Sequence, residues 1–541
     1  MVAFSDLRDA QLGKLNEAAG AWRKLTNELD DLEERSKDEV TGPIRGSGWK
    51  GPAAKAASAE LDRLDDEFAL ATLEVRNVAT ALDAAVGEFQ GLQQELRRAI
   101  DEATDLHLKI RDDGAVELPP VAASERDDPG TAQARSRLAA QAQQLADRIT
   151  GIVRRATDAD GRYASALAEF APVENLAEQP NAWHDAADDS RLAARLTGIN
   201  QNAIPDPNAE NFDPRRARAW WDGLSEERQE LYKQLFPGRV GALDGLPAED
   251  RDEANTLALR ERIGELENKQ GQTLSGFERR DLERSKALLC RLEASEGGAK
   301  ELLLVGIDNE ADGRALVAVG NPDTARHTAV VVPGVGTELD DMPGQIARAE
   351  RIQAAADDLT ADRRGDVAVV AWLGYDTPGV DLSALRSSFA EAGGRELDGF
   401  VDGLRAAQGG EHHHVTAVGH SYGSTVVGEA AKSGDGLAVD DIAVAGSPGM
   451  HVDHVRDLKI DPQHVWAGHA EGDAISGWAG SIPGIHNNEP SDEDFGANRY
   501  HVDTHGHSGY WDPNSESLRN QARIITGQYN RVTLDHGRPP S

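Results

Sequence analysis

Apolar side chains in the first 170 residues recur at alternating steps of three and four, with polar residues between them. This spacing places them on one stripe of a helix and predicts three long helices. The stripes are Leu15, Ala18, Trp22, Leu25, Leu29 and Leu32; Leu61, Leu64, Phe68, Ala71, Val75, Val78, Leu82, Ala85, Phe89, Leu92 and Leu96; and Leu138, Ala142, Leu145, Ile149, Ile152, Ala156, Ala159, Tyr163, Ala166 and Phe170. Neither of the first two helices could keep its apolar stripe from water alone, so we expect them to pair antiparallel and the third to pack against them.

The pattern changes twice further along the chain. A segment rich in Pro, Asn, Asp and Ala predicts an irregular linker, and helical periodicity resumes after it. Later, short β-branched runs such as HTAVVVPG, DVAVVAWLG and HVTAVGHS alternate with helix-like segments, which predicts a mostly parallel sheet with helices on both faces. The expected regions are an all-α helical-hairpin or coiled-coil domain (1–172), the linker (173–215), a helical bridge (216–298) and an α/β domain (299–541).

Composition removes several classes of protein. The chain of 541 residues has 57 Lys and Arg against 94 Asp and Glu, and its formal net charge of -37 disfavours nucleic acid as a partner. Cys290 is the single cysteine, so the chain has no intramolecular disulfide. No apolar run approaches the ~18 residues of a transmembrane helix, and the N-terminus lacks the pattern of a signal peptide. We expect neither a membrane span nor a signal peptide.

Gly419-His420-Ser421-Tyr422-Gly423 has the G-x-S-x-G pattern of a nucleophile elbow, a sharp turn from strand to helix that exposes the serine. The pentapeptide alone is also compatible with a glycine-rich turn. Here an apolar run (414–418) precedes it and a stretch of small residues (424–431) follows it, as strand, elbow and helix require. The context therefore predicts that Ser421 is a nucleophile.

A serine hydroxyl needs a histidine to accept its proton and a carboxylate to orient that histidine. In this type of domain both follow the serine along the chain. Asp473, in a loop after the run HVWAGHA, is the predicted acid, with Glu471 as its rival and a helix-capping role as the alternative. His507, in the loop NRYHVDTHGHSGYWD, is the predicted base, ahead of His505 and His501.

An acyl-transfer site also needs two main-chain N–H donors for the oxyanion. Tyr422, directly after the nucleophile, is the first candidate, and Val335, in the PGVGT loop after the run TAVVV, is the second. An ordinary tight turn is the alternative for that loop. The run His412 to His414 does not predict a metal site, because three consecutive ligands do not converge easily on one ion. We expect no metal and no cofactor.

Seven motifs occur in a fixed order: WWDGLSEERQ, PGRVGALDGLPAEDRDEAN, VVVPGVGT, WLGYDTP, GHSYGS, AGSPGM and HSGYWD. Together they resemble an uncharacterised actinobacterial α/β-hydrolase family, formerly a domain of unknown function, over about residues 190–530. The resemblance implies an α/β-hydrolase fold that includes the helical bridge. It also implies that Ser421, Asp473 and His507 form the triad. It implies no substrate.

Trp49-Lys50-Gly51 lies at the expected turn of the hairpin and resembles the W-x-G signature of small helical-hairpin proteins exported by ESX, or type VII, secretion systems. Glycine allows the reversal, and the tryptophan can seal the end of the seam. Those proteins or their partners also carry a Tyr followed four residues later by an acid, whereas here Leu167 follows Tyr163. The resemblance implies a helical partner and leaves cytoplasmic and exported locations open.

The sequence thus predicts a serine hydrolase that cleaves small carboxylic esters, lipid esters included, through an acyl-enzyme on Ser421. The preference for esters over amides or thioesters rests on analogy with the fold. The alternative is a type VII interaction or effector module with an auxiliary or silent hydrolase domain. A helical scaffold that self-associates through the apolar seam of its hairpin is a third hypothesis.

Overall fold

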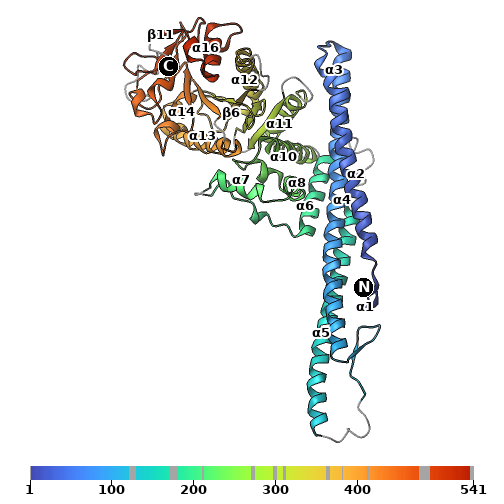
Figure 1. Cartoon of the computed structure of the whole chain (residues 1–541). Coiled ribbons are helices and arrows are strands. Elements are labelled where there is room, and N and C mark those ends of the chain that lie inside the picture. Colours follow the sequence, from blue (N-terminus) through green and yellow to red (C-terminus); the bar gives the residue numbers. More distant parts are fainter. Residues whose placement is uncertain are drawn as a thin grey trace. The chain divides into compact units, whose positions relative to one another are not determined.

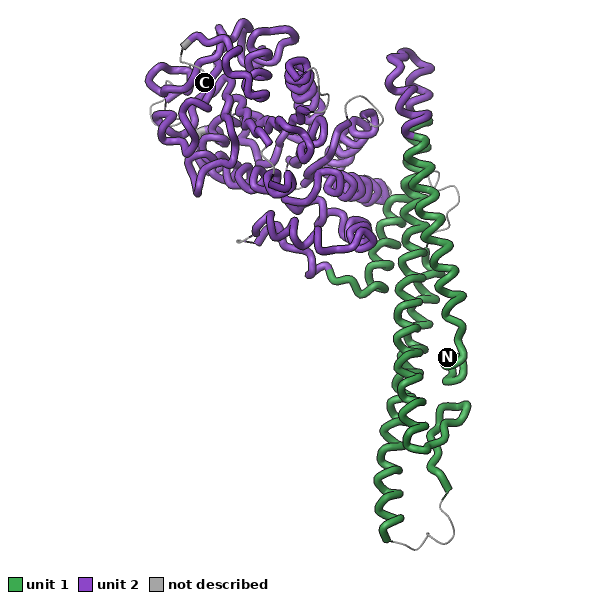
Figure 2. Tube along the Cα trace, viewed as in Figure 1, with its two compact units in different colours: residues 1–36, 59–200 green, residues 37–58, 201–541 purple. Residues whose placement is uncertain are grey.

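The computed structural model describes residues 2–120, 129–170, 181–209, 212–269, 274–295, 301–308, 312–360, 366–380, 382–410, 413–473 and 488–536 (Figure 1). The chain forms two compact units (Figure 2). Unit 1 comprises residues 1–36 and 59–200, and unit 2 comprises residues 37–58 and 201–541. None of the helices in the described residues combines the length and the apolarity needed to cross a membrane.

Unit 1 is built mainly from long helices. They are α1 (Phe4–Asp9), α2 (Leu12–Ser36), α4 (Pro52–Asp105), α5 (Pro129–Glu169) and α6 (Ala182–Thr197), with a small antiparallel ribbon of β1 (Lys109–Ile110) and β2 (Val116–Glu117). Leu92 and Leu96 of α4 pack with Leu145 and Ile149 of α5 in one core. All predicted positions of the third stripe are buried except Leu138, which is half-buried.

The rotation of α2 differs from the predicted one. Leu25 and Leu32 are 40% and 45% exposed, whereas Ala19 and Thr26 are buried. Two ion pairs with α4 flank Thr26: Arg23 contacts Asp83 at 2.7 Å, and Asp30 contacts Arg76 at 3.0 Å. These charged contacts lie beside a buried face of α2 that apolar spacing alone does not predict.

Two expectations for the linker and the turn are wrong. Helix α6 lies within 173–215, where we expected an irregular segment, and its alanines, including Ala186 and Ala193, are buried. Alanine is the strongest helix former, so its abundance there indicated a helix. The turn between α2 and α4 contains η1 (Lys37–Thr41) and α3 (Gly42–Gly46), and Trp49 in it is 53% exposed. Trp49 therefore does not seal the seam.

Unit 2 contains one sheet of nine strands. They are β3 (Leu302–Asp308), β4 (Arg314–Val319), β5 (His327–Val332), β6 (Val367–Leu373), β7 (His414–His420), β8 (Asp441–Ala445), β9 (Val465–Gly468), β10 (Asn498–Tyr500) and β11 (Leu534–His536). Their spatial order is β11-β10-β9-β8-β7-β5-β6-β4-β3. The six neighbouring strands β10, β9, β8, β7, β5 and β6 are parallel. At one edge β11 pairs antiparallel with β10, and at the other β4 pairs antiparallel with both β6 and β3.

Helices cover both faces of this sheet. Among the described residues of the unit, the α-helices of eight or more residues are α7 (Pro214–Asp222), α8 (Glu226–Leu235), α10 (Ala248–Asn268), α11 (Gly276–Glu293), α12 (Met342–Asp357), α13 (Ser387–Ala407), α14 (Tyr422–Lys432) and α16 (Glu516–Ile525). Shorter turns are α9 (Pro237–Gly241), η4 (Gln201–Ala203), η6 (Leu339–Asp341), η7 (Leu382–Leu385), η8 (Val455–Asp457), η9 (Pro462–His464), η10 (Gly509–Trp511) and η11 (Tyr529–Arg531). One core contains α10, α11, α12 and α16, and the other contains α13 and α14. The predicted all-α region followed by a mostly parallel, helix-flanked sheet is confirmed.

Candidate active site

Ser421 joins the end of β7 to the start of α14 in a strained conformation. Its φ is 52° and its ψ is -129°, although it carries a side chain. Backbone strain of this kind costs on the order of 1–3 kcal/mol and persists only where neighbouring structure enforces it. Here the Ser421 N–H donates to the Ala445 carbonyl at 3.0 Å, beside the end of β8. This is the geometry of a nucleophile elbow.

The two glycines of the motif allow the close packing around this turn. A Cβ on Gly419 would lie 2.6 Å from Ser424 Cα, and one on Gly423 would lie 2.2 Å from the Val332 carbonyl oxygen. Real Cβ atoms essentially never approach that closely. The spacing G-x-S-x-G thus follows from how α14 crosses β7 and β5.

Asp473 and His507 form a direct hydrogen bond. His507 Nδ1 lies 2.9 Å and 3.0 Å from the two carboxylate oxygens of Asp473. The Asp473 side chain is fully buried, whereas 23% of the His507 side chain is exposed. With Nδ1–H donated to the carboxylate, Nε2 is the ring atom that can accept a proton from a nucleophile.

The base loop lies against the elbow through His420, the residue before Ser421. The ring centroids of His420 and His507 are 4.8 Å apart. His420 Nε2 also lies 2.9 Å from the main-chain oxygen of His507. The fold therefore brings the predicted acid and base together next to the turn that carries Ser421.

The rivals of the predicted acid and base lie elsewhere. Glu471 and His505 are 3.7 Å apart, but their side chains are 87% and 76% exposed. His501 pairs with Asp535 at 2.9 Å, also near the surface. A buried carboxylate holds an imidazole more firmly than an exposed one, so the arrangement favours Asp473 and His507.

Two residues that sequence reasoning missed hold Asp473 in place. Tyr510 donates its hydroxyl to Asp473 Oδ2 at 2.7 Å and accepts the Ala470 N–H at 3.0 Å. Burial and the Asp473 carboxylate both raise the pKa of Tyr510, which keeps this donor protonated. Gly446 has a φ of 57°, and a Cβ there would lie 2.7 Å from Asp473 Oδ2. Both occur in the motifs HSGYWD and AGSPGM, which were the available signal.

The PGVGT loop runs beside Ser421. A Cβ on Gly334 would lie 2.7 Å from Ser421 Cβ and 3.1 Å from Ser421 Oγ. The Tyr375 hydroxyl donates to the Pro333 carbonyl at 2.8 Å, and the Gly336 N–H donates to the Pro378 carbonyl at 2.8 Å. The segment that contains Tyr375 and Pro378 thus anchors the loop. Val335 is half-buried in this loop.

Tyr422 is the first residue of α14 and the neighbour of Ser421. The first N–H groups of a helix have no partner within the helix and favour negative charge. The Tyr422 side chain is buried and donates to the Arg386 carbonyl at 2.9 Å, away from this end of the main chain. The main-chain N–H groups of Tyr422 and Val335 therefore stay the candidates for the oxyanion.

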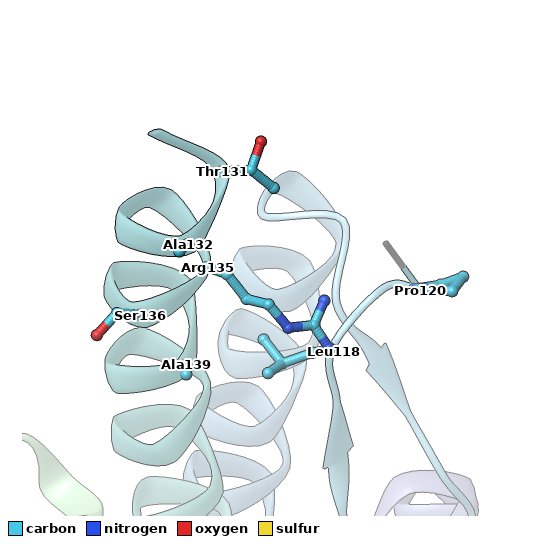
Figure 3. A pocket seen from close by; sticks show the side chains of 7 residues that line it. All are labelled: Leu118, Pro120, Thr131, Ala132, Arg135, Ser136 and Ala139. Atoms are coloured by element: carbon cyan, nitrogen blue, oxygen red, sulfur yellow. The ribbon is translucent and has the colours of Figure 1, made fainter. Parts of the chain in front are cut away.

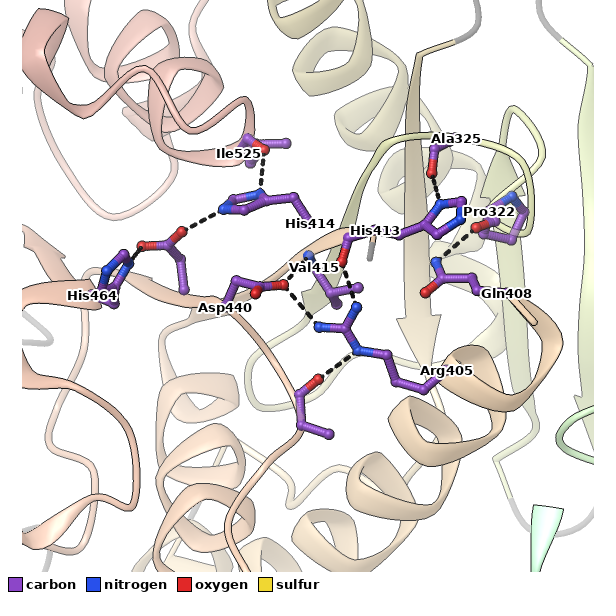
Figure 4. Close-up of polar contacts among 12 residues, drawn as sticks. Pro322, Ala325, Arg405, Gln408, His413, His414, Val415, Asp440, His464 and Ile525 are labelled. Atoms are coloured by element: carbon purple, nitrogen blue, oxygen red, sulfur yellow. Dashed lines mark hydrogen bonds and ion pairs between the residues drawn. The ribbon is translucent and has the colours of Figure 1, made fainter. Parts of the chain in front are cut away.

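The two described histidines at the start of β7, His413 just before the strand and His414 as its first residue, have separate structural partners. His413 Nδ1 lies 2.6 Å from the Ala325 oxygen, and His414 Nδ1 lies 2.9 Å from the Ile525 oxygen. Figure 4 shows the two rings turned to opposite sides of the strand. His412 lies outside the described residues.

A hollow of about 660 Å³ occurs in unit 1, at the start of α5. Its described lining includes Leu118, Thr131, Arg135 and Ser136 but no histidine or carboxylate. The Ser136 hydroxyl points away from Arg135 (Figure 3). Arg135 donates to the Pro119 carbonyl at 3.0 Å. This lining supplies no pair of nucleophile and base.

Comparison with known proteins relates this site to a hydrolase family. Residues 308–481 match a family described as alpha/beta hydrolase. This stretch contains Ser421 and Asp473 and ends before His507. Together with the nine-stranded sheet, the match identifies the fold of this region as that of an α/β hydrolase.

Uncharacterized mycobacterial proteins are similar to the chain. One from Mycobacterium tuberculosis is 26% identical, over 98% of this chain and 87% of that protein. Another from the same species and one from Mycobacterium bovis are each 33% identical over 171 residues, which is 30% of this chain and 64% of the relative. The first similarity extends over both units. None of these similarities tests the likeness of Trp49-Lys50-Gly51 to type VII proteins, which stays a prediction.

Proposed function

We propose that unit 2 is a serine hydrolase that cleaves small carboxylic esters, lipid esters included, through an acyl-enzyme on Ser421. The observation that supports this most directly is the hydrogen bond between His507 Nδ1 and the buried carboxylate of Asp473, formed next to a strained serine at the end of β7. An imidazole oriented by a buried carboxylate is the arrangement that activates a serine hydroxyl.

In the proposed reaction, Ser421 Oγ attacks the ester carbonyl carbon while His507 Nε2 takes the hydroxyl proton. Asp473 stabilises the imidazolium that results. The negative charge on the former carbonyl oxygen is stabilised by the N–H groups of Tyr422 and Val335, each worth about 2.7–4 kcal/mol in such sites. The C–O bond then breaks, and the leaving alcohol takes the proton from His507.

The second half of the reaction releases the acid. His507 removes a proton from a water molecule, which attacks the acyl-enzyme carbonyl. Collapse of this intermediate frees the carboxylic acid and returns the proton to Ser421. Amides and thioesters would follow the same steps, so a panel of matched substrates decides between the three.

The test is labelling of the full-length protein with a fluorescent fluorophosphonate, which reports serine activation without a known substrate. We expect wild type to label, Ser421→Ala to give no label, and His507→Ala to label more than about a thousandfold more slowly. The exposed rivals provide matched controls: His505→Ala and Glu471→Gln should label like wild type. A folded wild-type protein that does not label, or label that survives in Ser421→Ala, would overturn the proposal.

A further inference from the structure

His420 is buried beside the nucleophile but takes no part in the proposed proton transfer. Only 7% of its surface is exposed. Its ring lies 4.8 Å from the His507 ring and 4.8 Å, edge to face, from the Trp511 ring. An apolar residue would fill this space at a lower desolvation cost. Burial of the two ring nitrogens of His420 is therefore expected only if they make specific polar contacts.

Both nitrogens have partners that determine one tautomer. Nε2 lies 2.9 Å from the His507 carbonyl oxygen, which can only accept, so Nε2 carries the hydrogen. Nδ1 lies 3.4 Å from Arg348 Nη1, which can only donate. A neutral ring with hydrogen on Nε2 satisfies both contacts, whereas a doubly protonated ring would face Arg348 with a second donor.

The surroundings keep this ring neutral. Burial first, and then the positive charge of Arg348 and the proximity of His507, lower the pKa of His420 to about 3. Its protonation state therefore does not change over the range in which a catalytic histidine works. It is a fixed donor rather than a second base.

Arg348 is itself held in place by the base loop. Its guanidinium carbon lies 4.1 Å from the centre of the Trp511 ring, and the neighbouring Arg351 donates to the Trp511 carbonyl at 3.4 Å. Trp511 directly follows Tyr510, the donor to Asp473. Helix α12, the end of β7 and the loop 507–511 are thus joined around His420.

We infer that His420 is a positioning residue: as the neutral Nε2–H tautomer, oriented by Arg348, it holds the main-chain carbonyl of His507 and so fixes the imidazole between Asp473 and Ser421. The inference rests on the proposed function for its kinetic consequence. Misplacing a catalytic group by about 1 Å can cost roughly 100-fold in rate, so the loss of this anchor has a measurable effect.

Side chains of different chemistry separate positioning from packing. Glutamine can donate from Nε2 to the His507 carbonyl and accept from Arg348, so His420→Gln retains both contacts. Leucine fills the space without either contact, and asparagine is polar but too short to reach the carbonyl. Positioning predicts that the Gln variant resembles wild type, whereas a pure packing role favours Leu.

The experiment uses the full-length protein and two readouts. The first is the low-field proton resonance of the His507 Nδ1–H bound to Asp473, and the second is the rate of fluorophosphonate labelling. We expect His420→Gln to keep the resonance and to label within about threefold of wild type. We expect His420→Leu to lose the resonance and to label about 10- to 100-fold more slowly. If the Leu variant does not fold, His420→Asn should show the same loss.

Arg348→Leu tests whether Arg348 acts on His507 through its contact with His420. If Arg348 acts through His420, the double variant with His420→Leu labels no more slowly than His420→Leu alone. An unchanged resonance in both the Leu and Asn variants would overturn the inference. If wild type itself does not label, the proposed function fails, and the resonance still decides whether His420 positions His507.

Discussion

The carboxylate of Asp473 has a fixed position because three groups surround it. His507 and Tyr510 donate to it, and Gly446 leaves the room that its Oδ2 occupies. The carboxylate is fully buried, so the loss of either donor leaves its charge less well compensated. Tyr510 and Gly446 should therefore affect the reactivity of Ser421, although neither takes part in the proposed proton transfer.

Tyr510→Phe should slow fluorophosphonate labelling about 10- to 100-fold. The change removes a hydrogen bond to a charged group, worth about 1.5–3 kcal/mol, and frees the carboxylate to turn away from His507. Tyr529→Phe is the matched control, because Tyr529 also donates to a buried aspartate, Asp441, at 2.6 Å. Equal slowing in both variants would indicate a general loss of stability instead.

Gly446→Ala should abolish most labelling in a protein that still folds. The added Cβ would lie 2.7 Å from Asp473 Oδ2 and 3.0 Å from the Tyr510 ring, so the acid must move. Gly472→Ala is the control: Gly472 has a φ of 75° but open space around its Cβ position. Both variants carry the strain of a positive φ, about 1–2 kcal/mol, and only the first should lose reactivity. Similar rates for the two would contradict this account.

The residues of the candidate site differ in how far sequence could predict them. The G-x-S-x-G pattern is local, so Ser421 and its glycines could be assigned from adjacent residues. His505 and His507 are near neighbours in one loop, and only burial of the partner distinguishes them. The roles of Tyr510, Gly446 and His420 arise from contacts between distant segments. The motifs that contain these residues therefore mark the segments but do not give the role of each residue.

At the scale of elements, the buried carboxylate of Asp441 ties four segments together at the start of β8. It accepts from His414 at 2.8 Å, His464 at 3.0 Å, Trp466 at 2.8 Å and Tyr529 at 2.6 Å. These donors come from β7, η9, β9 and η11. Burial alone would raise the pKa of Asp441, but the hydrogen bonds lower it overall.

Asp441→Asn should therefore destabilise unit 2 by about 3–5 kcal/mol, because a buried charge network loses its centre. The measurement is the midpoint of urea unfolding. Asp440→Asn is the comparison: its carboxylate is 22% exposed and pairs with Arg405 at 2.8 Å. We expect a clearly smaller loss there. Equal losses would mean that the convergence of four donors adds nothing.

The helices also differ in how well their packing follows from sequence. The third stripe, on α5, is apolar at every step, so its buried face was predicted. On α2 the buried Ala19 and Thr26 lie one residue beyond the predicted positions Ala18 and Leu25. The ion pairs of Arg23 and Asp30 with α4 flank Thr26. Charged contacts between helices depend on the partner, so the heptad pattern gives the helix without its rotation.

At the scale of the whole molecule, the two units differ in how their stability should respond to pH. In unit 1, Glu74 of α4 is 1% exposed, and burial together with the nearby Asp189 of α6 raises its pKa to about 8. The folded unit therefore binds a proton that the unfolded chain releases above its ordinary pKa of 4.5. Stability from this group is present below 4.5 and is lost as pH rises to about 8.

Glu74→Gln removes this dependence, because glutamine stays neutral at every pH. In calorimetry of the full-length protein, the melting temperature of unit 1 should rise by several degrees at about pH 9 and change little at about pH 4.5. The transition of unit 2 should stay in place at both values, since the two units have separate cores. Glu102→Gln is the control, because Glu102 is half-exposed and pairs with Arg148. It should change the stability of either unit by no more than about 1 kcal/mol. An equal shift of unit 1 at both pH values would mean that Glu74 is ionised in the fold, and a shift of both transitions would mean that the units unfold together.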